Sequence, residues 1–316
     1  MSALTYDRGM DVTRLGGSTL AVSRVGLGCN NFGRKLDLAA TRAVVDAAIE
    51  AGITFFDSAD IYGSGESERF IGEALAGRAD RVVLATKFGN DMQGMNGDAP
   101  GGSRSYMRRA IDASLARLRL DHVDLYYYHR PDGVTPLEET LGAMHELVTE
   151  GKVRWLGLSN VDATHLAQAA SFAARGDSPI VAVQNYFSLM QRDDAADVLP
   201  LAAELGIGYI PYFPLESGLL TGKYRRGEPE PEGARLSGTD DGRLSDERLD
   251  RVDALDAFAA GRGHTLLELA IGGLASIPGV SSVIAGATSP EQVRANAAAG
   301  GWHLTEAELA ELTRLH

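Results

Sequence analysis

The sequence has little of what disulfide-rich or membrane-spanning proteins need. Among 316 residues there is one cysteine, Cys29, so an intrachain disulfide is excluded and a reducing compartment is compatible. No stretch approaches the roughly 20 apolar residues that a membrane helix requires. The first residues have neither the basic nor the apolar region of a signal peptide. We therefore expect a cytoplasmic protein.

Positive charge is also scarce, because 30 lysine and arginine residues stand against 43 aspartate and glutamate residues, for a formal net charge of −13. Nucleic acids and anionic membrane surfaces bind clustered cations, so we expect neither as a partner. A ligand that carries phosphate must be held by local donors and not by the field of the whole molecule. The oligomeric state stays unknown at this level.

What the chain does contain is a regular alternation of short apolar runs and helical patterns. The runs predict strands at residues 25–28, 53–56, 82–85, 123–128, 153–158, 180–183, 207–212 and 280–285. The patterns between and after them predict helices, the first capped by Thr41, at residues 41–51, 66–75, 104–119, 136–149, 162–173, 195–205, 265–275 and 290–299. Parallel strands need such crossovers, and eight units in about 250 residues fit an α/β fold of the (β/α)₈ barrel type.

Three further elements are expected outside the eight units. Residues 12–24 carry a Gly-Gly turn between alternating segments, which predicts an N-terminal β-hairpin. Residues 246–260 have apolar side chains at helical spacing and predict an extra helix before the seventh barrel helix. Residues 305–315 predict a C-terminal helix, capped by Thr305 with Glu308 three residues on.

The main alternative fold is a doubly wound sheet, which requires a nucleotide-binding fingerprint in its first turn. Residues 26–33 place their last glycine two positions late for it, and residues 218–223 are one residue short of a phosphate loop and lack its Ser or Thr. No domain boundary is apparent, so we expect one barrel domain over residues 1–316. The polar segment 225–246 is expected to be a long loop that acts as a lid over the site.

Polar residues close nearly every predicted strand. In a (β/α)₈ barrel the active site lies at the carboxyl ends of the strands, so these residues are expected to face one site. Each alone is compatible with a structural role, such as a helix cap, but their common position favours a site. The set is Asp57, Lys87, His129, Ser159, Asn160, Gln184, Asn185, Tyr212, Gly286 and Thr288, with Tyr62 in the loop after Asp57.

Four of these side chains form a coherent acid–base set without a metal. Lys87 follows a buried run, so its ammonium group needs a carboxylate, which Asp57 can supply. A cation near the Tyr62 hydroxyl is expected to lower the pKa of the phenol from about 10 and make it a usable acid. His129 can orient and polarise a carbonyl oxygen. Lys87 as a plain ion-pair residue and His129 as a loop histidine are the structural alternatives.

Several motifs together resemble the aldo-keto reductases. The stretch from Asp57 to Tyr62, Asp-Ser-Ala-Asp-Ile-Tyr, is similar to that family's Asp-to-Tyr signature, and Ala85-Thr86-Lys87 resembles its lysine strand. The resemblance covers residues 14–299 and is specific in combination. The other matching segments are Ser114-Leu-Ala-Arg-Leu118 with Asp124-Leu125, His129-Arg-Pro-Asp132, Gly157-Leu-Ser-Asn160 and Gly218-Leu-Leu-Thr-Gly-Lys-Tyr224.

The resemblance implies NAD(P)H-dependent reduction of an aldehyde or ketone, with a tetrad of Asp57, Tyr62, Lys87 and His129 in which Tyr62 is the proton donor. It also implies a set of cofactor-binding residues. Three residues match the family's positions that bind the nicotinamide carboxamide, namely Ser159, Asn160 and Gln184. Tyr212 matches the ring that stacks on the nicotinamide. The residues that match the family's pyrophosphate-binding segment are Pro214, Leu215, Ser217, Gly218 and Lys223. The residues that match its adenosine-binding positions are Gly286, Thr288, Gln292 and Asn296.

The choice between the two nicotinamide cofactors depends on a 2′-phosphate. Many NADP-specific relatives place Arg or Lys where this chain has Thr288 and Ser289. A phosphate site usually needs an Arg clamp, so Arg235 or Arg294 would have to serve. Glu216 adds negative charge near the same loop. Because the aldo-keto reductases that the chain resembles commonly use NADP(H), we expect NADP(H) to be favoured over NAD(H).

Two other functions are compatible with the same resemblance. One is an NAD(P)⁺-dependent sugar or alcohol dehydrogenase working in the oxidative direction. The other is a nicotinamide-binding regulatory subunit resembling the β-subunits of potassium channels, which carry Asn at the position of His129. A barrel whose strand-end residues are purely structural would bind no nicotinamide. The loop 88–95 and the short C-terminal tail are expected to line an open substrate pocket, but neither identifies the carbonyl or alcohol substrate.

Overall fold

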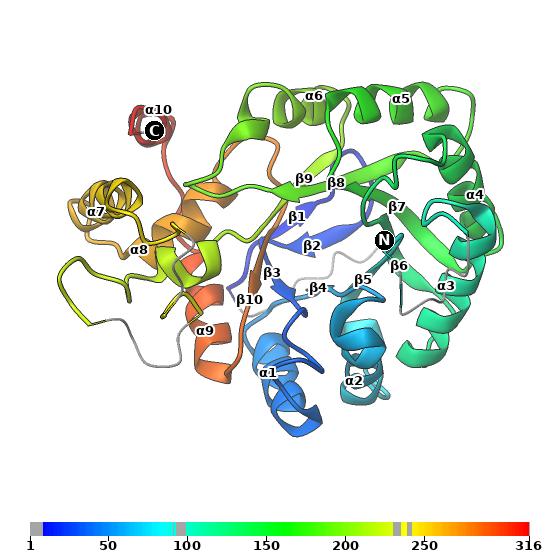
Figure 1. Ribbon diagram of the computed structural model, residues 1–316, viewed down its shortest axis with the longest axis horizontal. Coiled ribbons are helices and arrows are strands. Elements are labelled where there is room, and N and C mark those ends of the chain that lie inside the picture. The colour runs from blue at the N-terminus through cyan, green and yellow to red at the C-terminus, as the bar shows by residue number, and fades with distance from the viewer. Residues whose placement is uncertain (1–8, 91, 93–98, 230–234, 239–241, 316) are drawn as a thin grey trace.

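Parallel strands at the centre of the molecule form a nearly closed barrel (Figure 1). The computed structural model describes residues 9–90, 92, 99–229, 235–238 and 242–315. Within these residues eight strands pair in the order β10-β3-β4-β5-β6-β7-β8-β9, and every pair is parallel. The bounds are β3 Val25–Gly28, β4 Phe55–Asp57, β5 Val83–Phe88, β6 Val123–Tyr128, β7 Val153–Ser159, β8 Ile180–Tyr186, β9 Gly208–Tyr212 and β10 Val283–Gly286. The predicted (β/α)₈ architecture is confirmed.

Helices alternate with the strands along the chain and surround the barrel (Figure 1). The α-helices are α1 Leu38–Glu50, α2 Glu66–Ala74, α3 Arg104–Leu118, α4 Leu137–Thr149, α5 Ala163–Ala173, α6 Val198–Glu204, α7 Asp246–Ala260, α8 Leu266–Glu268, α9 Pro290–Ala299 and α10 Glu306–Thr313. A π-helical turn, η5 Leu269–Gly273, continues α8, and the 3₁₀ turns are η1 Tyr62–Gly65, η2 Ala79–Arg81, η3 Asp193–Ala195 and η4 Glu216–Thr221. The extra helix α7 and the C-terminal helix α10 are both present as predicted.

The predicted N-terminal hairpin closes the amino-terminal end of the barrel. Its strands, β1 Val12–Arg14 and β2 Ala21–Ser23, pair antiparallel, and Leu15 packs into the same hydrophobic cluster as the residues inside the barrel. The turn approaches the main chain before β9 closely: a Cβ on Gly16 would lie 2.2 Å from the carbonyl oxygen of Gly206. Gly16 also has a φ of +55°, so glycine is required there for two independent reasons.

The barrel closes between β9 and the residues just before β10. The backbone N–H of Tyr209 donates to the carbonyl oxygen of Gly279 at 3.0 Å, and Ser281 donates back to Tyr209 at 2.9 Å. The last strand was predicted from residue 280, whereas β10 begins at Val283. Residues 280–282 therefore contribute an isolated bridge and not a continuous ladder.

The period of two along the strands decides which side chains reach the site. In β4, Phe55 belongs to the cluster inside the barrel, so Asp57, two residues later, faces the same interior. In β5, Ala85 is interior and Lys87 follows it at the same spacing. Thr86 points outward instead, where its hydroxyl donates to a carboxylate of α2 at 2.5 Å. The site is thus the layer of the barrel interior that lies at the carboxyl ends of the strands.

Two boundaries differ from the sequence prediction for local reasons. The strand predicted over residues 82–85 is β5, which runs on to Phe88, so Lys87 lies within a strand and not after it. The first helix begins at Leu38 because the side chain of Asp37 accepts from the N–H of Ala40. Thr41, the predicted cap, is a buried residue inside α1.

The helix predicted over residues 265–275 is interrupted by the π-helical turn. A Cβ on Gly272 would lie 2.6 Å from the carbonyl oxygen of Trp302, so the chain after α9 packs directly on this turn. The helix predicted over residues 195–205 is shorter, with η3 before α6. Of the predicted lid, residues 230–234 and 239–241 lie outside the described residues, as do 91 and 93–95 of the expected substrate loop. Both interpretations stay predictions.

Candidate active site

A buried ion pair joins Asp57 on β4 and Lys87 on β5. The Nζ of Lys87 lies 2.5 Å from Oδ2 of Asp57 and donates to the carbonyl oxygen of Ser58 at 2.7 Å. Lys87 is completely buried. Burial lowers the pKa of its ammonium group, but Asp57 and Tyr62 together raise the pKa above its ordinary value. The sequence reasoning that paired these two residues therefore matches the geometry.

Tyr62, at the start of η1, lies over this pair. The Nζ of Lys87 is 5.1 Å from the centroid of the Tyr62 ring, and the ring meets that of His129 edge-on, with centroids 5.9 Å apart. The sequence predicted a lowered pKa for the phenol, and this is wrong in net direction. Burial raises the pKa of Tyr62 more than Lys87 lowers it. Tyr62 therefore keeps its proton at neutral pH, which is the form that an acid requires.

His129, the fourth residue of the expected tetrad, directly follows β6. Its backbone N–H donates to the carbonyl oxygen of Phe88 at 2.8 Å, which fixes the residue beside the end of β5. Burial lowers the pKa of the imidazole to about 3, and the charges of Lys87 and Arg130 act in the same direction. A neutral ring can donate one hydrogen bond without competing with Tyr62 for a proton.

The residues expected at the nicotinamide end are largely engaged with each other. Asn160, at a φ of +57°, donates to the carbonyl oxygen of His129 at 2.9 Å and accepts from the Tyr212 hydroxyl at 2.6 Å. Gln184 donates to Oδ1 of Asp57 at 2.9 Å. Ser159 is completely buried and accepts from the Asn160 amide at 3.1 Å. These contacts hold the layer rigid, and the side chains still line one cavity.

The segment from β9 into η4 is held by a buried carboxylate. Glu216 accepts from the Ser188 hydroxyl at 2.5 Å, from the Tyr186 hydroxyl at 2.7 Å and from Arg248 of α7 at 2.8 Å. Glu216 was expected to hinder phosphate binding through its negative charge, but this charge is offset by Arg248. Its role in the structure is therefore to anchor this turn.

The same turn has left-handed backbone at two residues that line the cavity. Ser217 and Gly218 have φ values of +58° and +98°. The predicted pyrophosphate-binding residues all line the cavity here, namely Pro214, Leu215, Ser217, Gly218 and Lys223. Turns of this kind present N–H groups that bind anions.

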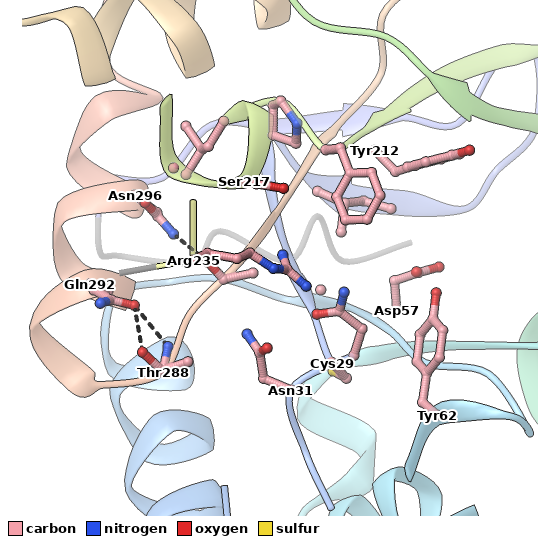
Figure 2. Close-up of a pocket in the computed structure, with 18 of the residues that line it drawn as sticks. Cys29, Asn31, Asp57, Tyr62, Tyr212, Ser217, Arg235, Thr288, Gln292 and Asn296 are labelled. Atoms are coloured by element: carbon pink, nitrogen blue, oxygen red, sulfur yellow. Dashed lines mark hydrogen bonds between the residues drawn. The ribbon is translucent and has the colours of Figure 1, made fainter. Parts of the chain in front are cut away.

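The far end of the cavity is formed by β10 and the start of α9. Thr288 donates through both its N–H, at 2.8 Å, and its hydroxyl, at 3.1 Å, to Oε1 of Gln292 (Figure 2). Asn296 donates to the carbonyl oxygen of Gly286 at 3.4 Å. All four residues predicted for the adenosine end thus lie together on one wall of the cavity.

Cations gather between the two ends. Arg235 lines the cavity, and Figure 2 shows its side chain between Thr288 and Tyr62. Burial lowers the pKa of Lys223, and the neighbouring charge of Arg235 lowers it further. The pKa of Lys35 is lowered by burial and by three nearby cations. We call Arg34, Lys35, Lys223 and Arg235 the cation cluster; no ion pair involves these four within the part of the chain that the structure describes.

One cavity of about 630 Å³ collects nearly the whole predicted site. Every predicted cofactor-binding residue lines it, as do Asp57, Tyr62 and His129, while Lys87 lies behind them. Arg294, the alternative phosphate ligand, does not line it and lies 3.9 Å from Glu50 and Glu291 instead. Cavity residues that sequence reasoning missed include Cys29, Asn30, Asn31, Lys35, Arg130, Phe213 and Thr221. For Lys35 the available signal was a basic pair after Gly33 in an acidic chain.

A parallel barrel whose strand ends converge on one polar cavity defines a (β/α)₈ enzyme-type site. The sequence model of the Aldo/keto reductase family matches residues 24–316, and the chain belongs to this family. Its members use nicotinamide cofactors.

Curated relatives narrow the class further. A probable voltage-gated potassium channel subunit beta of Oryza sativa subsp. japonica is 37% identical over 91% of this chain and 90% of its own length. An L-glyceraldehyde 3-phosphate reductase of Escherichia coli (strain K12) is 34% identical over 89% of this chain and 85% of its own. A probable aldo-keto reductase 1 of Glycine max is 38% identical over 66% of this chain and 61% of its own length. The family and the reductases support an oxidoreductase function.

Neither a membrane-spanning helix nor a cluster of potential metal ligands is found in the described residues. Among their helices, none has the length and apolar character needed to cross a bilayer. Among their His, Cys, Asp and Glu side chains, no group of three or more could hold a metal ion.

Proposed function

We propose that this protein is an NAD(P)H-dependent carbonyl reductase that converts an aldehyde or ketone into an alcohol. The observation that supports it most is the buried assembly of Asp57, Lys87, Tyr62 and His129 at the floor of a cavity with a cationic far half. The donor set fits a nicotinamide dinucleotide, because polar side chains line one end and a strained turn with cations follows it. When bound, such a cofactor supplies the hydride.

The protein's own residues supply the proton and the orientation. Tyr62 donates its phenolic proton to the carbonyl oxygen of the substrate as negative charge develops there. Lys87 stabilises the phenolate that remains, and Asp57 keeps Lys87 charged and in place. His129 donates a hydrogen bond to the same carbonyl oxygen. Asp57 therefore acts through Lys87 and not as a base.

We propose NADP(H) as the favoured cofactor, with Arg235 as a ligand of its 2′-phosphate. Arg235 and Lys223 line the cavity near Thr288, and Lys35 faces them from the loop after β3. A guanidinium group binds phosphate through paired, charge-assisted hydrogen bonds. Uncompensated cations inside a protein of net charge −13 are the feature that a dianionic group would neutralise.

Fluorescence titration tests the cofactor preference. We expect NADPH to bind at least about tenfold more tightly than NADH, and Arg235→Met to remove most of that difference. Arg294→Met is the matched control, since this arginine lies outside the cavity. Equal affinities in the parent protein would refute the preference, and an unchanged ratio in Arg235→Met would refute the assignment of Arg235.

The acid is tested by Tyr62→Phe, which removes only the hydroxyl. We expect kcat for an aldehyde panel to fall by on the order of 100-fold or more, because general acid catalysis is worth that much. NADPH affinity, measured by the same titration, should stay within about twofold, because the ring remains in place. Turnover at the parent rate would contradict the proton-donor role.

The second candidate function is a nicotinamide-binding regulatory subunit, favoured by the similarity to the rice relative. The third is an alcohol or sugar dehydrogenase, which uses the same site in the reverse direction. Turnover measured in both directions separates them: cofactor binding without turnover of aldehydes, ketones or alcohols would support the regulatory role. The presence of His129 beside Tyr62 favours turnover.

A further inference from the structure

We propose that Asn90 is a positioning residue that sets the tautomer of His129, so that Nε2 carries the hydrogen donated to the carbonyl oxygen. This rests on the proposed function of the site. The Nδ2 of Asn90 lies 2.8 Å from the Nδ1 of His129. An amide nitrogen only donates, so Nδ1 must be the bare acceptor and the remaining ring hydrogen must sit on Nε2.

The orientation of the His129 ring is restrained at its backbone as well. Its N–H donates to Phe88 at 2.8 Å, and its carbonyl oxygen accepts from Asn160 at 2.9 Å. With the main chain held on both sides and Nδ1 bound to Asn90, rotation of the imidazole would break the side-chain bond. The face of the ring toward Tyr62 is thereby kept in the cavity.

Asn90 is held in turn from helix α3. The hydroxyl of Tyr106 donates to the carbonyl oxygen of Asn90 at 2.7 Å and lies 3.2 Å from Oδ2 of Asp60. Tyr106 and Asp60 are almost completely buried. The backbone N–H of Asp60 donates to the carbonyl oxygen of Lys87 at 3.1 Å, so this network also contacts the strand that carries the lysine. Asn90 is therefore part of a fixed frame.

A neutral donor suits the electrostatics of the site. The charged and titratable groups that influence or contact the ring are Lys87 of β5, Arg130 after β6 and Tyr62 of η1, while Asn90 is a neutral hydrogen-bond partner. Two cations near the ring disfavour an imidazolium, which agrees with the pKa of about 3. With the cationic form excluded, the tautomer alone decides whether the cavity side of the ring donates or accepts.

Long-range ¹H–¹⁵N spectra of the histidine side chains test the tautomer without turnover. His129 is assigned by its loss in His129→Gln. We expect a bare Nδ1 and a protonated Nε2 in the parent, and a mixture of both tautomers in Asn90→Leu. An Nδ1-protonated ring in the parent, or the same tautomer in Asn90→Leu, would overturn the proposal.

A double-mutant cycle gives a kinetic test. Asn90→Leu should lower kcat at least about tenfold while the KM for NADPH stays within about twofold. In a His129→Gln background the same change should have almost no effect on kcat, because Asn90 acts through His129. Additive losses in the double variant would overturn the proposal, whereas a parent protein that turns over no carbonyl compound would overturn the proposed function instead.

Asn90→Asp adds a pH readout with almost no change in shape. A carboxylate at Nδ1 favours a proton there, so it raises the pKa of His129 and leaves Nε2 bare once the ring is neutral. Activity of Asn90→Asp should then fall as pH rises through this new pKa, while the parent stays flat over the same range. Profiles of activity against pH with the same shape in Asn90→Asp and the parent would contradict the positioning role of Asn90.

Arg130 carries an independent inference at the same end of the cavity. It lines the cavity next to His129, is exposed, and forms no ion pair within the residues that the structure describes. The adjacent Asp132 does not neutralise it, because that carboxylate accepts from the N–H of Gly102 at 2.8 Å and from the N–H and hydroxyl of Thr135, both at 2.8 Å. Asp57 is already paired with Lys87.

We infer that the carbonyl substrate carries an anionic group, a carboxylate or a phosphate, bound by Arg130. This inference also rests on the proposed reduction. Arg130 directly follows His129 and lines the same cavity as His129 and Tyr212. After burial and Lys87, its charge is a further cause of the lowered pKa of His129. An anion held there would place a carbonyl group a few bonds away within reach of Tyr62 and His129.

Two pairs of aldehydes separate the possible anions: 4-oxobutanoate against butanal, and glyceraldehyde 3-phosphate against glyceraldehyde. We expect the ratio of kcat/KM for the charged member to kcat/KM for the neutral member to exceed one in at least one pair, and to fall about 10- to 100-fold in Arg130→Met. Arg81→Met, an exposed arginine of η2, is the matched control. Equal preferences in Arg130→Met and the parent would overturn the inference; no turnover of all four aldehydes would overturn the proposed function.

Discussion

Buried charges among the described residues of this barrel fall into two kinds, those in an ion pair and those outside one. Lys87 and Asp57 satisfy one another and are further bound by Ser58 and Gln184. Asp60 is also buried, but its Oδ1 has no hydrogen-bond partner and Glu68 is a nearby like charge. Burial and Glu68 raise the pKa of Asp60 to about 7, although Tyr106 opposes the shift. A carboxylate of this kind makes stability depend on pH.

Asp60→Asn tests that dependence. Because the folded-state pKa is raised, the folded protein holds the proton more tightly, and the Asp60 contribution falls as pH rises from about 4 to about 7. Asp60→Asn should therefore be more stable than the parent at pH 8, with the difference shrinking toward pH 4. Urea unfolding at several pH values measures it. Asp80→Asn, at an exposed aspartate, is the control, and a difference independent of pH would contradict the assignment.

The site position of a single residue could be predicted from the sequence only where neighbouring residues in the chain indicated it. Asp57 and His129 follow apolar runs, so the barrel rule was enough to bring them together. The bond between Asn90 and His129 joins two loops that are 39 residues apart, and no local pattern marks it. Lys35 and Arg130 were missed for the same reason, since an exposed cation has the same sequence pattern on a rim as on any surface. The direction of the Tyr62 pKa shift required the burial of the ring.

At the level of elements, the turn after β9 is the part of the site with the most strained backbone. Phe213, Glu216 and Ser217 are non-glycine residues with φ values of +56°, +48° and +58°. Such conformations persist only where surrounding contacts hold them. The contacts come from β8, through the Tyr186 hydroxyl and the adjacent Ser188, and from α7, through Arg248. The extra helix before the seventh barrel helix therefore has a role in fixing this turn, where the pyrophosphate is expected to bind.

Glu216→Gln should loosen this turn without removing a cavity-lining side chain. It leaves Arg248 without its carboxylate and weakens three hydrogen bonds, so we expect the NADPH dissociation constant to rise about tenfold and stability to fall by about 2 kcal/mol. Titration and urea unfolding give the two values. Arg248→Met should reproduce the change in affinity. An unchanged dissociation constant in both variants would show that α7 does not hold the turn.

The order and type of the elements followed from periodicity, whereas their ends followed from specific contacts. A short apolar run predicted β5, but its continuation to Phe88 depends on pairing with β6 up to Tyr128. The first helix starts at Leu38 because Asp37 caps it, and Thr41 has the same capping chemistry at a position that tertiary packing buries. The π-helical turn reflects the contact of Gly272 with the chain at Trp302, which no local pattern predicts.

At the scale of the whole molecule, the net charge of −13 and the cation cluster act in opposite directions on an anionic ligand. The long-range field is expected to oppose the approach of a dinucleotide, whereas the cation cluster, of which Lys35, Lys223 and Arg235 line the cavity, is expected to attract it. Salt screens separated surface charges more strongly than close ones in a partly buried site. The balance is therefore expected to change with ionic strength.

Comparison of NADPH and NADH at several salt concentrations measures that balance. NADPH carries one more phosphate than NADH. If the cation cluster binds that phosphate, as proposed, the affinity for NADPH should fall more steeply between about 50 and 500 mM salt than the affinity for NADH. In Arg235→Met the two slopes should converge, because the extra phosphate has lost its main partner. Lys152→Met, at a half-buried lysine that pairs with Asp112 outside the cavity, should leave both slopes unchanged. Equal slopes in the parent would place the 2′-phosphate away from the cluster and reverse the cofactor assignment.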